Sequence, residues 1–144
     1  MYNRYLITGS TGFLGRAIIE KLVRRNVRVD ALVLRNDPYA ALLPEEVHTV
    51  IGDVCEDDSL DRFFADADNN TCVIHCAGII SVASRSGSKL YQVNIGGTCK
   101  VIRQCQEHHI GKMIYVSSVH AIPEKPKNCV ITEDCEFSPG LVDG

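Results

Sequence analysis

Three glycines near the N-terminus are spaced to let a backbone turn approach a phosphate group. Gly9, Gly12 and Gly15 follow a short apolar run at residues 5–7, and the residues after them have helical period. This order predicts a strand, a glycine turn and a helix. Glycine has no Cβ to keep a ligand away, and the N–H groups of a first helical turn attract anions. The pattern therefore predicts a dinucleotide-binding loop.

The glycines have separate expected roles. Gly9 allows a tight turn out of the strand, Gly12 lets the backbone approach a pyrophosphate, and Gly15 lets the helix pack near the strand. Ser10 and Thr11 add hydroxyl donors. The predicted cofactor-binding residues of this stretch are Gly9, Ser10, Thr11, Gly12, Phe13, Leu14 and Gly15.

The rest of the chain alternates between apolar strands and amphipathic helices. We expect strands at 4–8, 27–34, 48–51, 72–78 and 112–116, and helices at 12–25, around 57–64 and at 90–109. Such alternation is typical of an α/β fold with a doubly wound parallel sheet of the Rossmann type, in the strand order 3-2-1-4-5. The predicted dinucleotide-binding domain covers residues 1–118. Residues 119–144 are expected to be an irregular segment leading to a C-terminal part outside this sequence.

Arg35 is the candidate for choosing the cofactor. It follows the second expected strand, about twenty residues after the glycine loop, where an acidic residue would bind the ribose of NAD and an arginine would accept the 2′-phosphate of NADP. Asp30 lies at the start of that strand, too early for the ribose. The position favours NADP over NAD, and the alternative is that Arg35 is a solvated turn residue.

Other candidates follow the later strands, at the edge where an open α/β sheet binds its ligand. Asp53 and Val54 follow the third strand, and Ala77 and Gly78 end the fourth with small side chains that would let a ribose approach. Asn94 lies in the first turns of the long helix. The serines Ser117 and Ser118 follow the fifth strand.

Composition excludes several classes of protein. The chain has 144 residues, 45% of them hydrophobic, and a net charge of −3 without a run of basic residues, so we expect one globular domain and no nucleic-acid partner. We find no signal peptide and no stretch long enough to span a membrane, and expect a cytoplasmic protein. The seven cysteines contain no Cys-x-x-Cys pair, so we predict reduced thiols and no metal site.

Five motifs together resemble the extended short-chain dehydrogenase/reductase family, the NAD(P)-dependent epimerases and dehydratases. They are Thr8–Gly15, Gly52–Val54, His75–Gly78, Val93–Thr98 and Tyr115–Ser118. The resemblance implies that Asp53 contacts the adenine amine and that Ser118, or else Ser117, hydrogen-bonds the substrate oxygen. With Arg35, it is closest to the dihydroflavonol-reductase-like branch, which prefers NADPH. It implies a small-molecule substrate with a carbonyl or hydroxyl group.

The sequence departs from this family in one respect. Tyr-x-x-x-Lys, which carries the family's acid/base tyrosine, occurs nowhere in the 144 residues. We therefore expect an N-terminal portion of a longer oxidoreductase or epimerase/dehydratase, inactive as given, whose fifth strand has an open edge and self-associates. The alternative is a non-catalytic dinucleotide-binding sensor or interaction module. A methyltransferase is disfavoured by the glycine spacing and by Arg35.

Overall fold

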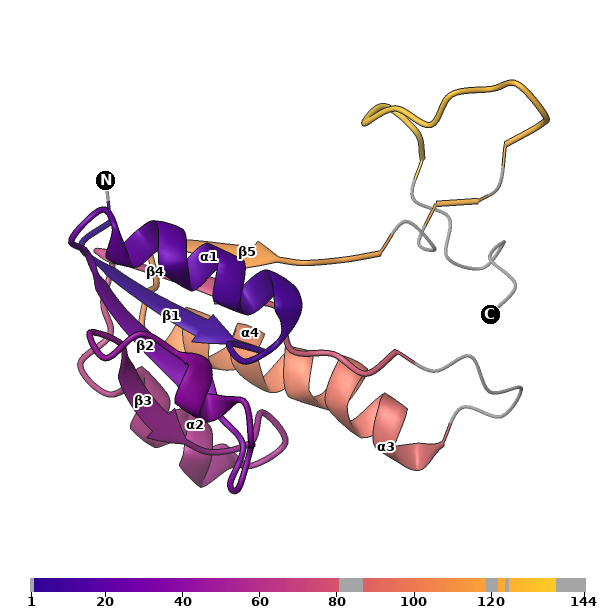
Figure 1. Ribbon diagram of the computed structural model, residues 1–144. Coiled ribbons are helices and arrows are strands. Elements are labelled where there is room, and N and C mark those ends of the chain that lie inside the picture. The colour runs from indigo at the N-terminus through magenta and orange to yellow at the C-terminus, as the bar shows by residue number, and fades with distance from the viewer. Residues whose placement is uncertain (1, 81–86, 119–121, 124, 137–144) are drawn as a thin grey trace.

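The computed structural model describes residues 2–80, 87–118, 122–123 and 125–136. Five parallel strands form one sheet in the order β3-β2-β1-β4-β5, which confirms the predicted order (Figure 1). The strands are β1 (Arg4–Thr8), β2 (Arg28–Val33), β3 (His48–Ile51), β4 (Thr71–His75) and β5 (Lys112–Tyr115).

Helices cover both faces of the sheet (Figure 1). Because alternate side chains of a strand point to opposite faces, Leu6 of β1 packs with Phe63 and Val101 on one face, whereas Ile7 packs with Ile19 on the other. The first face is covered by α2 and α4, the second by α1. The helical segments are α1 (Phe13–Val23), η1 (Ala40–Leu42), α2 (Asp57–Phe64), α3 (Ser88–Tyr91), η2 (Gln92–Gly97) and α4 (Thr98–Glu107).

The fourth strand is shorter than the predicted 72–78. Its pairing with β5 ends at His75, opposite Tyr115. The next two amides bond instead to Thr8: that of Cys76 to the carbonyl oxygen at 3.1 Å, and that of Ala77 to the side-chain hydroxyl at 3.2 Å. The chain thus leaves the sheet over the end of β1.

The expected helix at 90–109 is three segments in succession. It begins at Ser88, and its middle part, η2, has the wider turn of a π-helix. Such turns are rare inside helices and often occur at functional sites. The helix ends at Glu107, and His109 takes the left-handed conformation (φ +49°), so the chain turns before Gly111, the predicted cap.

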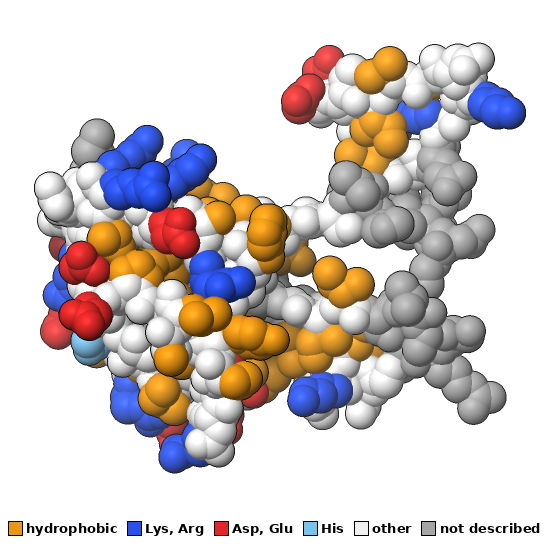
Figure 2. Space-filling model, in the orientation of Figure 1, with side chains coloured by type: hydrophobic (Ala, Val, Ile, Leu, Met, Phe, Trp, Pro, Cys, Tyr) orange, Lys and Arg blue, Asp and Glu red, His pale blue; other side chains and the backbone are white. Residues whose placement is uncertain are grey.

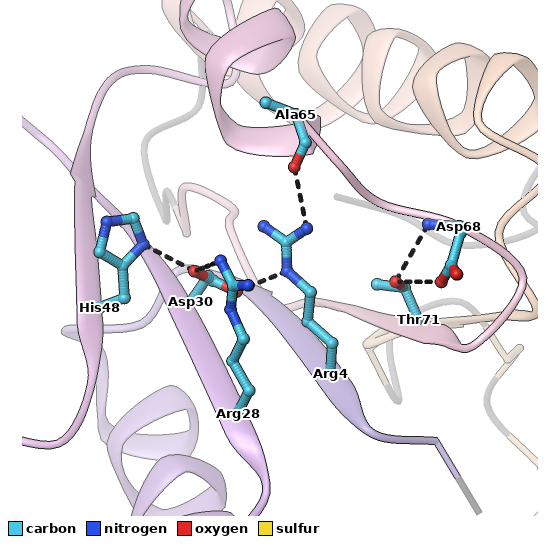
Figure 3. A network of polar contacts seen from close by, with 7 residues as sticks. All are labelled: Arg4, Arg28, Asp30, His48, Ala65, Asp68 and Thr71. Carbon is cyan, nitrogen blue, oxygen red and sulfur yellow. Dashed lines mark hydrogen bonds and ion pairs between the residues drawn. The ribbon is translucent and has the colours of Figure 1, made fainter.

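A buried ionic cluster joins three strands near their amino ends (Figure 3). The carboxylate of Asp30 on β2 is fully buried and accepts from Arg4 Nε at 2.7 Å and from Arg28 Nε at 3.2 Å. His48 Nδ1 of β3 lies 2.6 Å from its other oxygen. Arg4 also donates to the carbonyl oxygen of Ala65, directly after α2, at 2.8 Å. This cluster lies at the edge opposite the glycine loop.

Beyond β5, the described residues up to Glu136 contain turns but no helix or strand. In the part of the chain that the structure describes, none of the helices has the length and apolar character needed to cross a membrane.

Candidate dinucleotide-binding cleft

A cleft of about 330 Å³ opens at the carboxyl ends of the strands. It lies where the strand order reverses between β1 and β4, the place where open α/β sheets bind their ligands. Among the described residues, its walls are Gly9, Thr11, Leu32, Leu34, Asp37, Gly52, Asp53, Val54, Ala77, Gly78, Ile79, Lys89 and Val93. Segments that follow β1, β2, β3 and β4 therefore meet in one cavity.

The glycine loop is packed backbone against backbone. Gly9 has φ +65°, a conformation that side chains disfavour, and a Cβ there would lie 2.6 Å from the amide nitrogen of Ala77. A Cβ on Gly15 would lie 2.2 Å from the carbonyl oxygen of Gly9. The loop thus packs closely against the backbone of residues 76–77, which follow β4, and against the first turn of α1.

The start of α1 offers donors to an anion. Gly12 precedes the helix, and no side chain of the described residues caps it. The amides at 13–15 therefore lack the usual capping acceptor, and the helix dipole favours negative charge there. The side chain of Phe13 is 89% exposed and that of Leu14 also faces solvent, and neither lines the cleft.

The two hydroxyls of the loop are engaged within the protein. Ser10 is fully buried and donates to the carbonyl oxygen of Leu32 at 2.7 Å, which ties the loop to β2. Thr11 lines the cleft and donates to Asp37 Oδ2 at 2.7 Å. In this structure both hydroxyl protons orient the loop itself.

The turn after β2 carries two opposite charges, those of Arg35 and Asp37. Asp37 lines the cleft, and its second oxygen accepts the amide of Tyr39 at 2.9 Å, so both carboxylate oxygens have partners. Arg35 is exposed and lies outside the cleft wall, and it makes no ion pair with any described residue.

Asp53 and Val54 lie on the wall that follows β3. Asp53 Oδ1 accepts the amide of Cys55 at 2.9 Å, which fixes a turn with the carboxylate at the cleft, and Val54 is buried beneath it. Burial, and then the charge of Asp53, raise the pKa of the Cys55 thiol; burial likewise raises the pKa of Cys76. Both thiols stay protonated at neutral pH, so neither is an activated nucleophile.

The opposite wall is held by Asn94. Ala77 and Gly78 line the cleft, followed by Ile79. Asn94 does not line the wall, but its side chain forms two hydrogen bonds with Ile79. It accepts from the amide at 2.7 Å and donates to the carbonyl oxygen at 2.9 Å. The predicted cofactor residue Asn94 is thus placed behind the wall, as a support.

Ser117 and Ser118 follow β5 and are exposed. They are not among the residues that line the cleft. The described structure therefore brings together six of the predicted residues: Gly9, Thr11, Asp53, Val54, Ala77 and Gly78.

Two charged wall residues, Asp37 and Lys89, were not predicted. Asp37 lies in the Asn-Asp-Pro turn after β2, and its place two residues beyond Arg35 was the available signal. Lys89, in α3, comes from a polar connection that has no period and so gave no signal.

Comparison with known proteins identifies the family to which this chain belongs. The sequence model of the 3-beta hydroxysteroid dehydrogenase/isomerase family matches residues 6–138, nearly the whole chain. This chain belongs to that family. The 3-beta hydroxysteroid dehydrogenase/isomerase family is one of dinucleotide-binding oxidoreductases related to the short-chain dehydrogenases, so the resemblance predicted from the five motifs is confirmed.

Several relatives are similar over the same region. Short-chain dehydrogenase/reductase family 42E member 1 of Macaca fascicularis is 30% identical over 119 residues, 81% of this chain and 30% of that protein. Human 3 beta-hydroxysteroid dehydrogenase type 7 is 30% identical over 130 residues, 85% of this chain and 34% of that protein. The chain thus spans about a third of the length of these relatives.

Solved structures agree on the fold. The UDP-glucose 4-epimerase of Thermus thermophilus, solved in complex with NAD, has a TM-score of 0.83 at 24% identity, and the match covers 96% of this chain and 45% of the epimerase. The doubly wound parallel sheet of this chain is therefore the sheet of the epimerases and short-chain dehydrogenases.

Proposed function

We propose that this chain binds a nicotinamide dinucleotide in the cleft at the carboxyl ends of its strands. The observation that carries the proposal is the packing of the glycine loop: at Gly9 and Gly15 a Cβ would collide with backbone. Gly9 lies on the cleft wall, and the first amides of the helix that follows have no side-chain cap among the described residues. The NAD complex of the structurally similar epimerase supports the same class of ligand. When bound, such a cofactor supplies the hydride chemistry.

We further propose that Arg35 selects NADP(H) over NAD(H). Arg35 is exposed, has no ion-pair partner among the described residues, and directly follows Leu34, which lines the cleft. A 2′-phosphate would receive charge-assisted hydrogen bonds from it. Asp37, the acidic residue of this turn, accepts a hydrogen bond from Thr11 at one carboxylate oxygen and from the amide of Tyr39 at the other. Fewer of its lone pairs are therefore free to bind the ribose hydroxyls of NAD.

For the whole protein we propose a reductase or an epimerase/dehydratase acting on a carbonyl or hydroxyl group. The family match over residues 6–138 supports this class of reaction. In it, Ser118 or Ser117 would hydrogen-bond the substrate oxygen. The 144 residues hold no Tyr-x-x-x-Lys, so we expect this chain alone to bind dinucleotide without turning over a substrate.

Calorimetric titration with NADPH and with NADH tests the choice of cofactor. We expect tighter binding of NADPH, and about tenfold weaker NADPH binding in Arg35→Ser with NADH binding unchanged, because a hydrogen bond to a charged group contributes about 1.5–3 kcal/mol. Arg24→Ser removes the same charge directly after α1, far from the loop, and should change neither affinity. A wild-type preference for NADH would refute the role of Arg35.

A further inference from the structure

A buried histidine that does not line the cleft lies behind its wall. His75, the last residue of β4, is fully buried and bonded through both ring nitrogens. Its Nδ1 lies 2.6 Å from Thr8 Oγ1, at the end of β1, and its Nε2 lies 3.0 Å from Thr98 Oγ1, at the start of α4. The ring of Tyr115 stacks on it with centroids 5.6 Å apart.

The hydrogen bonds around the ring can run in only one direction. Thr98 donates its hydroxyl proton to the carbonyl oxygen of Asn94 at 2.8 Å, so toward His75 it must accept, and Nε2 carries the proton. Nδ1 is then an acceptor and takes the hydroxyl proton of Thr8. The oxygen of Thr8 in turn accepts the amide of Ala77 at 3.2 Å. Every member of this chain of bonds is satisfied when the imidazole is neutral.

The two ends of this series of hydrogen bonds hold the same wall of the cleft. At one end Thr8 binds the amide of Ala77, and at the other end Asn94 binds both backbone groups of Ile79. Ala77, Gly78 and Ile79 line the cleft consecutively. We call the bond from Ala77 to Thr8 the Thr8 clamp and the two bonds between Asn94 and Ile79 the Asn94 clamp. His75 lies between the two clamps and so links β1, the π-helical turn and the cleft wall.

We propose that His75 is a positioning residue for the dinucleotide: as the neutral Nε2–H tautomer it joins the Thr8 and Asn94 clamps and so fixes the wall formed by residues 77–79. The consequence for cofactor affinity rests on the proposed function, whereas the consequence for the wall does not.

The environment of the ring favours the neutral form. Burial lowers the pKa of His75 to about 4. Among the described residues, the hydroxyls of Thr8 and Thr98 bond to the ring and the ring of Tyr115 stacks on it, and none of these three is an Asp, Glu, Lys or Arg. A protonated ring would donate from both nitrogens and would turn the Thr8 hydroxyl away from its present bond. At neutral pH the ring is therefore neutral, which is the form that the hydrogen bonds described above require.

Amide hydrogen exchange in Thr98→Val tests the link without any ligand. Valine keeps the shape of threonine and removes the bonds to His75 and Asn94. We expect the Ile79 amide to exchange about fivefold faster relative to that of Val73 in the core of β4, the effect of one hydrogen bond of about 1 kcal/mol. Thr98→Ser should restore the slow exchange. Thr71→Val is the matched control: it removes a buried hydroxyl at the other end of β4, where Thr71 binds Asp68, and should leave this ratio unchanged.

Two further measurements complete the test. Nitrogen NMR of the His75 ring should show the neutral Nε2–H tautomer, and NADPH affinity should fall several-fold in Thr98→Val but not in Thr71→Val. An Nδ1–H tautomer, an unchanged exchange ratio, or equal NADPH affinity in Thr98→Val and wild type would each overturn the proposal. If the wild type bound no dinucleotide, the proposed function would fail, and the exchange ratio and the tautomer would still decide the role of His75.

Discussion

A methyl group at Gly15 would lie 2.2 Å from the carbonyl oxygen of Gly9, far inside contact distance. Because the Cβ is fixed directly to the backbone at position 15 and the oxygen belongs to the backbone of Gly9, neither can move away without opening the loop. We predict that Gly15→Ala weakens NADPH binding more than tenfold, a loss of roughly 1.4 kcal/mol or more. Titration calorimetry measures it.

Gly87→Ala is the control for this substitution. It makes the same change directly before α3, where a Cβ would meet no atom of the described residues within 4 Å. Its NADPH affinity should equal that of the wild type. If Gly15→Ala also bound like the wild type, the tight packing of the loop would have no part in binding.

At the scale of the elements, the ionic cluster around Asp30 ties β1, β2 and β3 together (Figure 3). Burial alone would raise the pKa of Asp30, but the hydrogen bonds from Arg4 and Arg28 outweigh it and lower the pKa. We predict that Asp30→Asn reduces the free energy of unfolding by roughly 3 kcal/mol, because it leaves the buried charge of Arg4 without its partner. Urea unfolding at pH 7 measures this loss.

The pH dependence of the same variant has a definite sign. A lowered pKa in the fold means that the carboxylate stabilises the protein above its ordinary pKa of 3.8 and loses this effect as the pH falls through the folded-state pKa. The difference between wild type and Asp30→Asn should therefore shrink in acid. Asp58→Asn, an exposed position in α2, should cost little at any pH. Equal stability of Asp30→Asn and wild type at pH 7 would contradict the prediction.

Element boundaries could be predicted where local sequence decides them. β1 and β3 begin and end at the expected residues because turn residues bound their apolar runs. The end of β4 and the π-helical turn could not be predicted, because they involve partners distant in the sequence: the amide of Ala77 bonds to the side chain of Thr8, and Asn94 bonds to Ile79. Periodicity carries no information about such partners.

At the scale of the whole molecule, the alternation of strands and helices predicted the sheet order, and the order placed the cleft. Gly9, Asp53 and Ala77 meet there because each follows a strand. The inward position of Asp37 and the outward position of Arg35 could not be read from the sequence, since they depend on how one turn folds over the glycine loop.

The outer edge of the sheet leads us to propose self-association. Among the described strands β5 pairs only with β4, so its other edge is open, and Ile114 and Tyr115 are 40% and 51% exposed. Hydrophobic side chains also interrupt the charged surface of the face shown in Figure 2. We predict concentration-dependent association by light scattering, reduced in Ile114→Lys, because a charge on an edge strand opposes pairing.

Ile131→Lys is the control for the edge variant. It adds the same charge at an exposed position outside the sheet and should associate like the wild type. A wild-type chain that stays monomeric at high concentration would refute association through β5.

The most direct test of the central claim is the NADPH titration of the wild-type chain followed at the backbone amides by NMR. If the dinucleotide binds in the cleft, the largest shift changes will fall on residues 9–15, on Asp53 and on residues 77–79, with those at the Asp30 edge unaffected. Saturation without shifts at the glycine loop, or no binding of NADPH or NADH, would contradict the account.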